Sequence, residues 1–226
     1  MTPQLAFKPP TSPAAVLKAR TDWLADQDVA EPFRAAGAVI RVAEGQEIFA
    51  EGDEADLFYK VISGVVRICK FLNDGRRQIE AFHVTEDVFG LELSDAHLLS
   101  AEAVSECTLV AYRRRSIEKL AEADRSVGRQ LLQYAMQNLA QAQQHALLLG
   151  RRGAAERVAG FLLSWAKDGC VLSLAMTRQD IADFLGLTIE TVSRSFSQFE
   201  RDGLITLLNA REVRLKNIDA LQELAA

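Results

Sequence analysis

Three polar residues in the last quarter of the chain have the types and the spacing needed to read bases in DNA. Glu190 is followed by Ser193 and Arg194, so an α-helix would place all three on one face. An arginine can bind guanine O6 and N7 with two hydrogen bonds, a carboxylate can accept from cytosine N4, and a serine hydroxyl can donate or accept. These residue types at this spacing favour sequence-specific recognition of double-stranded DNA.

An alternative interpretation is that Glu190 and Arg194 form a surface ion pair, because residues four apart on a helix are neighbours. The residues before them favour base reading instead. Thr177 and Asp180 resemble a capping box at the start of one helix, and Gly186 can end that helix in the left-handed conformation. Two short helices joined at a glycine are typical of a helix-turn-helix.

Phosphate contacts are expected where the two helices begin, because free backbone N–H groups and short polar side chains there can face an anion. The candidate residues are Thr177, Arg178, Gln179, Thr188 and Thr191. Residues 203–207 and 212–215 then predict a β-hairpin, which would complete a winged helix-turn-helix. The arginines of this wing, Arg211 and Arg214, are further candidates for phosphate contacts.

The region before this unit has the turn signals of an antiparallel β-structure. Short runs rich in β-branched and aromatic residues are separated by glycines and by the Asn73-Asp74-Gly75 turn, which is typical of a hairpin. Regularly spaced short strands of this kind predict a barrel or a sandwich. The predicted strands span residues 39–42, 57–62, 65–71, 78–83 and 108–112.

From Ser116 the apolar residues change to a helical period and form a heptad seam, whose alanines would let two helices approach closely. After Gly128, the seam residues are Leu132, Ala135, Leu139, Ala142, Ala146 and Leu149. Such a seam favours homodimerisation. The alternative is a helix packed on its own barrel, a role for which Val127, Leu131 and Tyr134 on an adjacent face are better suited.

The composition is that of a packed soluble protein, with 226 residues, 49% hydrophobic and 25% charged, and a net charge of −5. This acidic balance argues against general coating of nucleic acid, so DNA affinity must come from local basic groups and weaken with salt. No apolar run approaches the length that a membrane span needs, and the first residues lack the apolar core of a signal peptide. A cytoplasmic location, away from membranes, is therefore expected.

Neither the cysteines nor the histidines have the spacing of a metal site. Cys69, Cys107 and Cys170 are scattered, and reduced thiols in or near a core are expected. Cys170, the thiol nearest to the helix-turn-helix, is the candidate redox residue. The chain has no paired carboxylates, nucleophile elbow or phosphate-binding loop, which argues against an enzyme.

Several segments resemble the CRP/FNR regulators, over a span from about residue 38 to residue 220. Residues 146–162 resemble the end of the dimer helix and the hinge of the FNR branch. Residues 186–194, Gly-Leu-Thr-Ile-Glu-Thr-Val-Ser-Arg, resemble the recognition helix of FNR and FixK regulators. The segments similar to the cyclic-nucleotide-binding-type barrel of the family are residues 51–56, 59–67, 74–79 and 87–90.

The resemblance implies an α+β protein with an N-terminal cyclic-nucleotide-binding-type antiparallel β-barrel (jelly roll), a long dimerisation helix and a C-terminal winged helix-turn-helix. The expected organisation is a mobile tail over residues 1–20, the barrel over 21–115, the dimerisation helix over 116–150 and the DNA-binding domain over 151–226. Residues 150–153, Gly-Arg-Arg-Gly, are the expected joint between the two halves.

The resemblance also implies a homodimeric transcription regulator that reads a palindrome related to TTGAT-N4-ATCAA, with Glu190, Ser193 and Arg194 as base readers. In the cAMP-binding branch an arginine precedes the glutamate, and Ile189 at that position favours the FNR-type half-site. By the same resemblance, exposed loops such as residues 73–77 would contact RNA polymerase. The expected targets are genes of microoxic or anaerobic metabolism or nitrogen fixation, with activation favoured and repression the alternative.

The chain departs from the family at the groups that hold a signal. A cAMP pocket would need a Gly-Glu-Leu start and an arginine for the phosphate, but residues 90–92 are Gly-Leu-Glu and residues 78–112 contain no arginine. No cysteine precedes Cys69, which argues against the iron–sulfur cluster of FNR. No cofactor or metal is therefore expected, and sensing of haem, a redox signal or another small ligand is the alternative. Glu86 stands at a turn position where the family usually has glycine.

Overall fold

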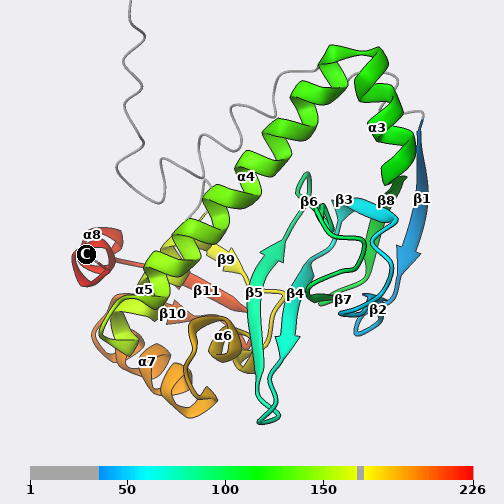
Figure 1. The fold of residues 1–226 in the computed structure, drawn as a ribbon. Coiled ribbons are helices and arrows are strands. Elements are labelled where there is room, and N and C mark those ends of the chain that lie inside the picture. Colours follow the sequence, from blue (N-terminus) through cyan, green and yellow to red (C-terminus); the bar gives the residue numbers. More distant parts are fainter. Residues whose placement is uncertain (1–35, 167–170, 226) are drawn as a thin grey trace, which may run out of the picture.

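The computed structural model describes residues 36–166 and 171–225. They form the expected α+β architecture, with an antiparallel β-barrel, a long helix and a winged helix-turn-helix in that order (Figure 1). The predicted tail, residues 1–20, and the candidate redox residue Cys170 lie outside the described residues. Among the described helices, none combines the length and the apolarity needed to cross a membrane.

The barrel consists of two four-stranded antiparallel sheets, with strand orders β1-β8-β3-β6 and β2-β7-β4-β5. Its strands are β1 (Gly37–Val42), β2 (Glu47–Phe49), β3 (Leu57–Ser63), β4 (Val66–Phe71), β5 (Arg77–His83), β6 (Val88–Phe89), β7 (Ser100–Ala103) and β8 (Cys107–Arg113). Buried side chains from both sheets, among them Val61, Val66 and Leu109, share one apolar core. Side chains alternate between the two faces of each strand, and those that point inward form this core.

The five strands expected from the sequence are all present, with ends that differ by at most two residues. The sequence did not reveal β2, β6 and β7, because two to four residues are too few to show an alternation. The turn before β6 keeps a positive φ of 77° at Glu86. Its N–H donates to the Val61 carbonyl (2.8 Å) and its carboxylate pairs with Lys60 Nζ (2.6 Å), contacts that hold this uncommon conformation.

Two helices follow the barrel where the sequence predicted a single helical segment from Ser116. α3 (Arg114–Ala123) and α4 (Arg125–Leu149) meet at Asp124. The Asp124 carboxylate accepts a hydrogen bond from the N–H of Ser126 (2.8 Å) and so caps α4. The long helix α4 therefore begins at residue 125, and the residues before it form the separate short helix α3.

α4 packs on the barrel with the face that the sequence predicted. Val127 and Tyr134 are buried among apolar residues of β3, β6 and β8, and Asn138 Nδ2 donates to the Val88 carbonyl (3.0 Å). The helix runs across the molecule from α3 to the C-terminal unit (Figure 1). The heptad seam lies on a different face of α4 from these barrel contacts.

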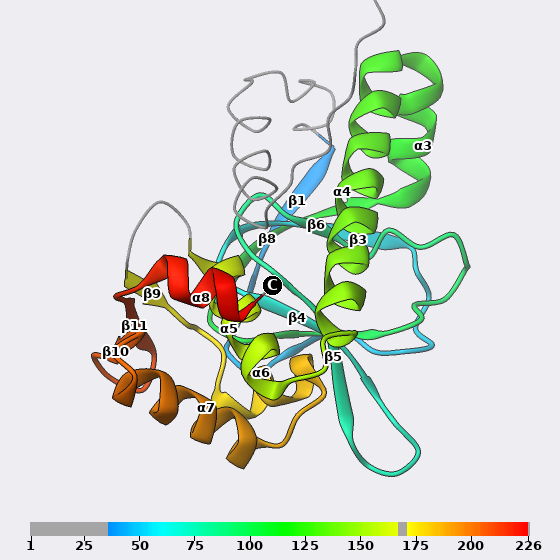
Figure 2. The same cartoon turned by 90° about the vertical axis from the view of Figure 1, so that its left-hand side faces the viewer.

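The C-terminal unit is a winged helix-turn-helix. Its elements are α5 (Ala154–Trp165), β9 (Val171–Ser173), α6 (Arg178–Leu185), α7 (Ile189–Arg201), β10 (Ile205–Leu207), β11 (Glu212–Leu215) and α8 (Ile218–Leu224). The predicted hairpin is the β10–β11 pair, and β9 adds to β11 as a third strand. In two views, α6 lies beside β5 of the barrel and α7 lies beyond α6 (Figure 1, Figure 2).

Candidate nucleic-acid interface

The first helix of the motif, α6, begins and ends as its sequence predicts. Thr177 and Asp180 form a reciprocal capping box, in which the Asp180 N–H donates to Thr177 Oγ1 (3.1 Å) and the Thr177 N–H donates to Asp180 Oδ2 (2.9 Å). At the other end Gly186 takes the left-handed conformation with φ 62°, which favours a residue without a Cβ. The resulting tight turn leads directly into α7.

α7 has one face in the domain core and one face in solvent. Thr188 caps the helix by accepting a hydrogen bond from the Thr191 N–H (3.3 Å). Val192, Phe196 and Phe199 are buried, and they pack in the core that α5 and α6 share. The opposite face is therefore held rigidly while its polar groups stay accessible.

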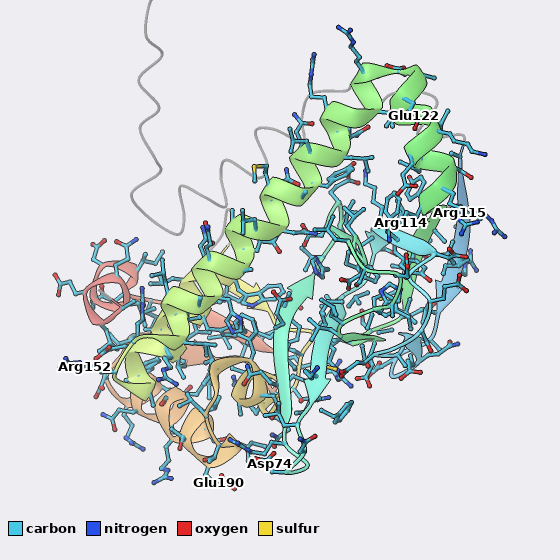
Figure 3. The ribbon with its side chains drawn as sticks, viewed as in Figure 1. Asp74, Arg114, Arg115, Glu122, Arg152 and Glu190 are labelled. Carbon is cyan, nitrogen blue, oxygen red and sulfur yellow. The ribbon has the colours of Figure 1, made fainter. Side chains whose placement is uncertain are left out.

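The three predicted base readers lie on the exposed face of α7. Glu190, Ser193 and Arg194 are all exposed, and Glu190 lies at the same end of the molecule as Asp74 at the tip of the β4–β5 hairpin (Figure 3). Arg194 Nε lies 3.4 Å from the carbonyl oxygen of Glu190. Within the described ranges the Glu190 and Arg194 side chains form no salt bridge with each other. The alternative interpretation, in which the two residues form a surface ion pair, requires such a salt bridge.

The charge of Glu190 suits an acceptor. The backbone N–H of Glu190, the Thr188 side chain and the positive charge of Arg194 lower the pKa of its carboxyl. The group is therefore ionised at neutral pH and can accept a hydrogen bond from an amino group. Near phosphates the same charge would be repelled, which favours a position over a base edge.

Four of the five predicted backbone-contact residues lie at the surface of the motif. Thr177, Gln179 and Thr188 are exposed where α6 and α7 begin. Thr191 is half-buried, with its hydroxyl 3.1 Å from that of Thr188. The Thr177 N–H and hydroxyl already donate to Asp180, so the polar groups at the start of α7 are the better suited of the two sets to bind phosphate.

Arg178, the fifth, is held by the domain itself. Its guanidinium lies over the ring of Phe196, with Cζ 3.3 Å from the ring centroid. Burial lowers the pKa of Arg178 to about 10, so the group remains charged at neutral pH. Its Nη1 is buried and has no hydrogen-bond partner among the described residues. The side chain is therefore ordered by a cation–π contact rather than free in solvent.

The heptad seam of α4 is exposed over most of its length. The large apolar side chains exposed on this helix are Leu132 (61%), Met136, Leu139 (48%) and Leu147. Ala135 and Ala146 are also exposed, whereas Ala142 and Leu149 are half-buried. Exposed apolar residues gathered on one helix in this way typically mark an interaction surface.

The wing is partly engaged with the barrel. Arg211 Nη2 lies 3.7 Å from Glu44 Oε1, in the loop between β1 and β2, and both side chains are more than half exposed. Arg214 is exposed on β11. Both wing arginines named from the sequence are thus exposed, and Arg211 is the one with an ion pair to the barrel.

A cavity of about 210 Å³ lies between the barrel and α4, and its lining does not suit an anion. Glu80 and Glu92 line it together with His83, Asn138 and Gln141, and no lysine or arginine of the described residues contributes. Burial, reinforced by the charge of Glu92, raises the pKa of the Glu80 carboxyl. A cyclic phosphate would meet two carboxyl groups instead of the cation that it needs.

The two described cysteines are unsuited to redox signalling. Cys69 and Cys107 are both buried in the barrel. Burial raises the pKa of the Cys69 thiol to about 11 and also raises that of Cys107. Because the thiolate is the reactive form, buried thiols of this kind are inert.

Sequence reasoning missed a cluster of charged residues that joins the barrel to α6. Arg67 of β4 and Arg77 of β5 bind Asp180, and Arg77 also binds Asp183. The partners are separated by more than 100 positions, so one sequence contains no signal that pairs them. The side chain of Arg77 is 17% exposed, which corrects the expectation that all of residues 73–77 form an exposed loop; only the tip of the hairpin is exposed.

A β-barrel, a long connecting helix and a winged helix-turn-helix with an exposed polar face define a DNA-binding regulator. Residues 39–124 match the cyclic nucleotide-binding domain family, and residues 156–224 match the Crp-like helix-turn-helix domain family. The chain belongs to the CRP/FNR family of transcription regulators. It is a regulator and not an enzyme, as the sequence indicates.

The relatives and solved structures that it resembles include several FixK proteins. The nitrogen fixation regulation protein FixK of Azorhizobium caulinodans is 45% identical over 203 residues, which cover 86% of this chain and 82% of that protein. FixK of Rhizobium meliloti is 42% identical over 196 residues, or 85% of this chain and 90% of that protein. The structure of FixK2 from Bradyrhizobium japonicum matches with a TM-score of 0.80 at 43% identity, covering 84% of this chain and 98% of that chain.

Proposed function

We propose that this regulator binds DNA as a homodimer and reads a palindrome related to TTGAT-N4-ATCAA. The observation that carries the proposal is the exposed face of α7, where Glu190, Ser193 and Arg194 stand together on a buried support. The half-site contains one G·C pair. That pair offers guanine O6 and N7 to Arg194 and cytosine N4 to Glu190, with Ser193 beside them.

The apolar seam on α4 supports the homodimer. Leu132 and Leu139 are exposed on a face that the barrel does not use, and pairing with a second copy would bury them. A two-fold dimer presents two copies of α7, one for each half-site, about nine base pairs or roughly 31 Å apart along the DNA, which is close to one helical turn. The palindrome follows from this symmetry.

We assign the protein to activation of genes for microoxic or anaerobic metabolism or nitrogen fixation. The support is the naming of its relatives, which include FixK and the transcriptional activatory protein AadR of Rhodopseudomonas palustris, 38% identical over 200 residues. The exposed tip of the β4–β5 hairpin, residues 72–76, is the proposed contact with RNA polymerase. Transcription in vitro from a promoter that bears the palindrome would distinguish activation from repression.

Arg194→Ala tests the base-reading assignment. Binding to the palindrome, measured by fluorescence anisotropy, should weaken by about tenfold or more per half-site. The preference for G·C over A·T at the third position of each half-site should also be lost. Arg201→Ala is the matched control, because Arg201 is exposed at the other end of the same helix. If Arg194→Ala kept the wild-type base preference, the assignment of Arg194 would be wrong.

The cavity in the barrel favours a second candidate, a regulator of the same family that senses a small ligand other than a cyclic nucleotide. Its lining combines apolar side chains with Glu80 and Glu92, which excludes an anion more strongly than a neutral or cationic group. Calorimetry with haem and with cAMP tests it. Tight binding of haem would favour the sensing candidate, and tight binding of cAMP would contradict the electrostatic argument.

A further inference from the structure

We propose that Arg67 and Arg77 of the barrel are positioning residues for DNA recognition, because they hold α6 in one orientation and thereby fix where α7 meets the DNA. The inference rests on the proposed function, since it concerns the same reading face. We call the set of Arg67, Arg77, Glu102, Asp180 and Asp183 the barrel clamp.

Asp180 is the centre of the barrel clamp. Its Oδ1 accepts from Arg77 Nη2 (2.5 Å) and from Arg67 Nη1 (3.1 Å), while its Oδ2 accepts from Thr177 in the capping box. One carboxylate therefore both begins α6 and attaches it to the barrel. Arg77 Nε also donates to Asp183 Oδ2 (2.8 Å), so α6 is held at two points along its length.

The barrel itself orients the two arginines. Arg67 and Glu102 stand directly opposite each other on β4 and β7, and Arg67 Nε donates to Glu102 Oε2 (2.6 Å). The Arg67 and Arg77 side chains are each 17% exposed and that of Asp180 is 3% exposed. Ion pairs with so little contact with solvent are weakly screened, and loss of one partner leaves a buried charge uncompensated.

Aromatic residues support the same face of α6. Phe184 packs against Phe82 of β5, with ring centroids 5.3 Å apart. His145 of α4 stacks on Phe184 at 4.0 Å, and its Nε2 lies 2.7 Å from the Phe184 carbonyl oxygen. Apolar burial has no preferred direction. The charged contacts of the barrel clamp supply the direction that the apolar contact lacks.

A fixed α6 fixes α7, because the two helices share one core. In a dimer, the separation of the two α7 helices then depends on the barrel clamp in each protomer. One extra base pair moves a half-site by about 3.4 Å and turns it by about 35°. An intact clamp should therefore make the dimer selective for one spacing between half-sites.

The test compares Arg77→Ala with Arg76→Ala, because Arg76 is an exposed neighbour that pairs with Asp74 (2.7 Å) in the same hairpin. Anisotropy would measure binding to duplexes with N3, N4 and N5 spacers and to a single half-site. Arg77→Ala should lose about tenfold affinity for the N4 duplex and bind all three spacers with similar affinity. Its affinity for the single half-site should match the wild type, and Arg76→Ala should keep the wild-type spacing profile.

A second variant and a measurement without DNA guard against a folding defect. Arg77→Lys keeps a positive charge beside Asp180 and Asp183 and should restore part of the spacing preference. Trypsin cleavage within the joint, residues 150–153, reports release of the domain directly, since Arg152 is exposed there (Figure 3). We expect faster cleavage in Arg77→Ala, with an unchanged circular dichroism spectrum.

The outcomes separate the two proposals. A wild-type protein that bound the palindrome no better than unrelated DNA would contradict the proposed function, while the cleavage rates would still test the clamp. Equal spacing profiles and equal cleavage rates in the wild type and Arg77→Ala would overturn the role of the barrel clamp.

Discussion

The two helices of the reading motif use their charged residues in opposite ways. Asp180 and Asp183 of α6 face the barrel and are paired with arginines, whereas Glu190 and Arg194 of α7 are exposed. α6 binds a surface of its own chain, which is present as soon as the protein folds. Among the described residues, Glu190 and Arg194 of α7 have no ion-pair partner of this kind, and they are available to a separate molecule, which we propose is DNA.

The difference separates residues that position the motif from residues that recognise DNA. A substitution on the exposed face of α7 should change the free energy of unfolding by no more than about 0.5 kcal/mol, although it should weaken DNA binding strongly. A substitution of the charged residues of α6 should change both. Measuring stability and binding on the same variants therefore tests the comparison.

Asp180→Ala should have the largest effect on stability. It removes the carboxylate half of the capping box, which accepts from the Thr177 N–H, and a nearly buried partner of two arginines, so we expect a total loss of about 3 kcal/mol or more. Urea unfolding followed by circular dichroism measures it. Asp180→Asn keeps an acceptor for the capping box but removes the charge, so it measures the contribution of the ion pairs apart from that of the capping box. Equal stability of Asp180→Ala and the wild type would break the comparison between α6 and α7.

The same carboxyl predicts a pH dependence. Burial works to raise the pKa of Asp180, but the hydrogen bonds from Thr177 and the charges of Arg67 and Arg77 bring it below its ordinary value. A carboxyl with a lowered pKa stabilises the fold above its unfolded pKa, and the contribution is lost as the pH falls through the folded pKa. The stability difference between the wild type and Asp180→Asn should therefore be full at pH 7 and shrink below about pH 4.

Leu139→Glu should dissociate the dimer without changing the exposed face of α7 in either protomer. A charge in the centre of the seam opposes pairing of two copies of α4, so light scattering should show a monomer. Palindrome affinity should then fall by about 100-fold or more, because the second half-site no longer binds within one complex. Affinity for a single half-site should be unchanged.

Gln144→Glu is the matched control for this change, since it adds the same charge to an exposed position of α4 outside the seam. If Leu139→Glu remained a dimer while binding the palindrome normally, the seam would not be the dimer contact.

The local signals of the sequence were sufficient for the motif and the long strands. Thr177, Asp180, Gly186 and Thr188 act through neighbours a few residues away, so their roles as caps and turn follow from position alone. The seam and the barrel-facing residues of α4 follow from periodicity in the same way. The caps and the turn depend on residues within about two helical turns, and the seam depends on a repeat within one helix.

The contacts that position the motif could not be predicted in this way. The sequence around Arg67 and Arg77 indicates only that they lie on strands, and their ion pairs with α6 form only in the folded protein. In the same way, the sequence places Arg178 at a helix start but does not predict its contact with Phe196. The short strands β2, β6 and β7 are equally dependent on their partners. Residues that act across the two halves of the chain are visible only in the folded molecule.

A last comparison sets Asp180 against Glu80, a carboxyl in the barrel cavity with no arginine or lysine among the described lining residues. Burial and the charge of Glu92 raise the pKa of Glu80, so its ionised form is less stable in the folded than in the unfolded state. Well below its unfolded pKa the group is neutral in both states and contributes nothing, and at higher pH it opposes folding.

Glu80→Gln should therefore stabilise the protein at pH 7, by a small amount on the order of 0.5–1 kcal/mol, and have little effect at pH 3. Urea unfolding at both pH values measures this difference. Glu47→Gln on the exposed side of β2 removes the same charge from a solvated position and should leave stability nearly unchanged at either pH. Destabilisation by Glu80→Gln at pH 7 would mean that the carboxylate has a favourable role in the cavity, and the contrast with Asp180 would fail.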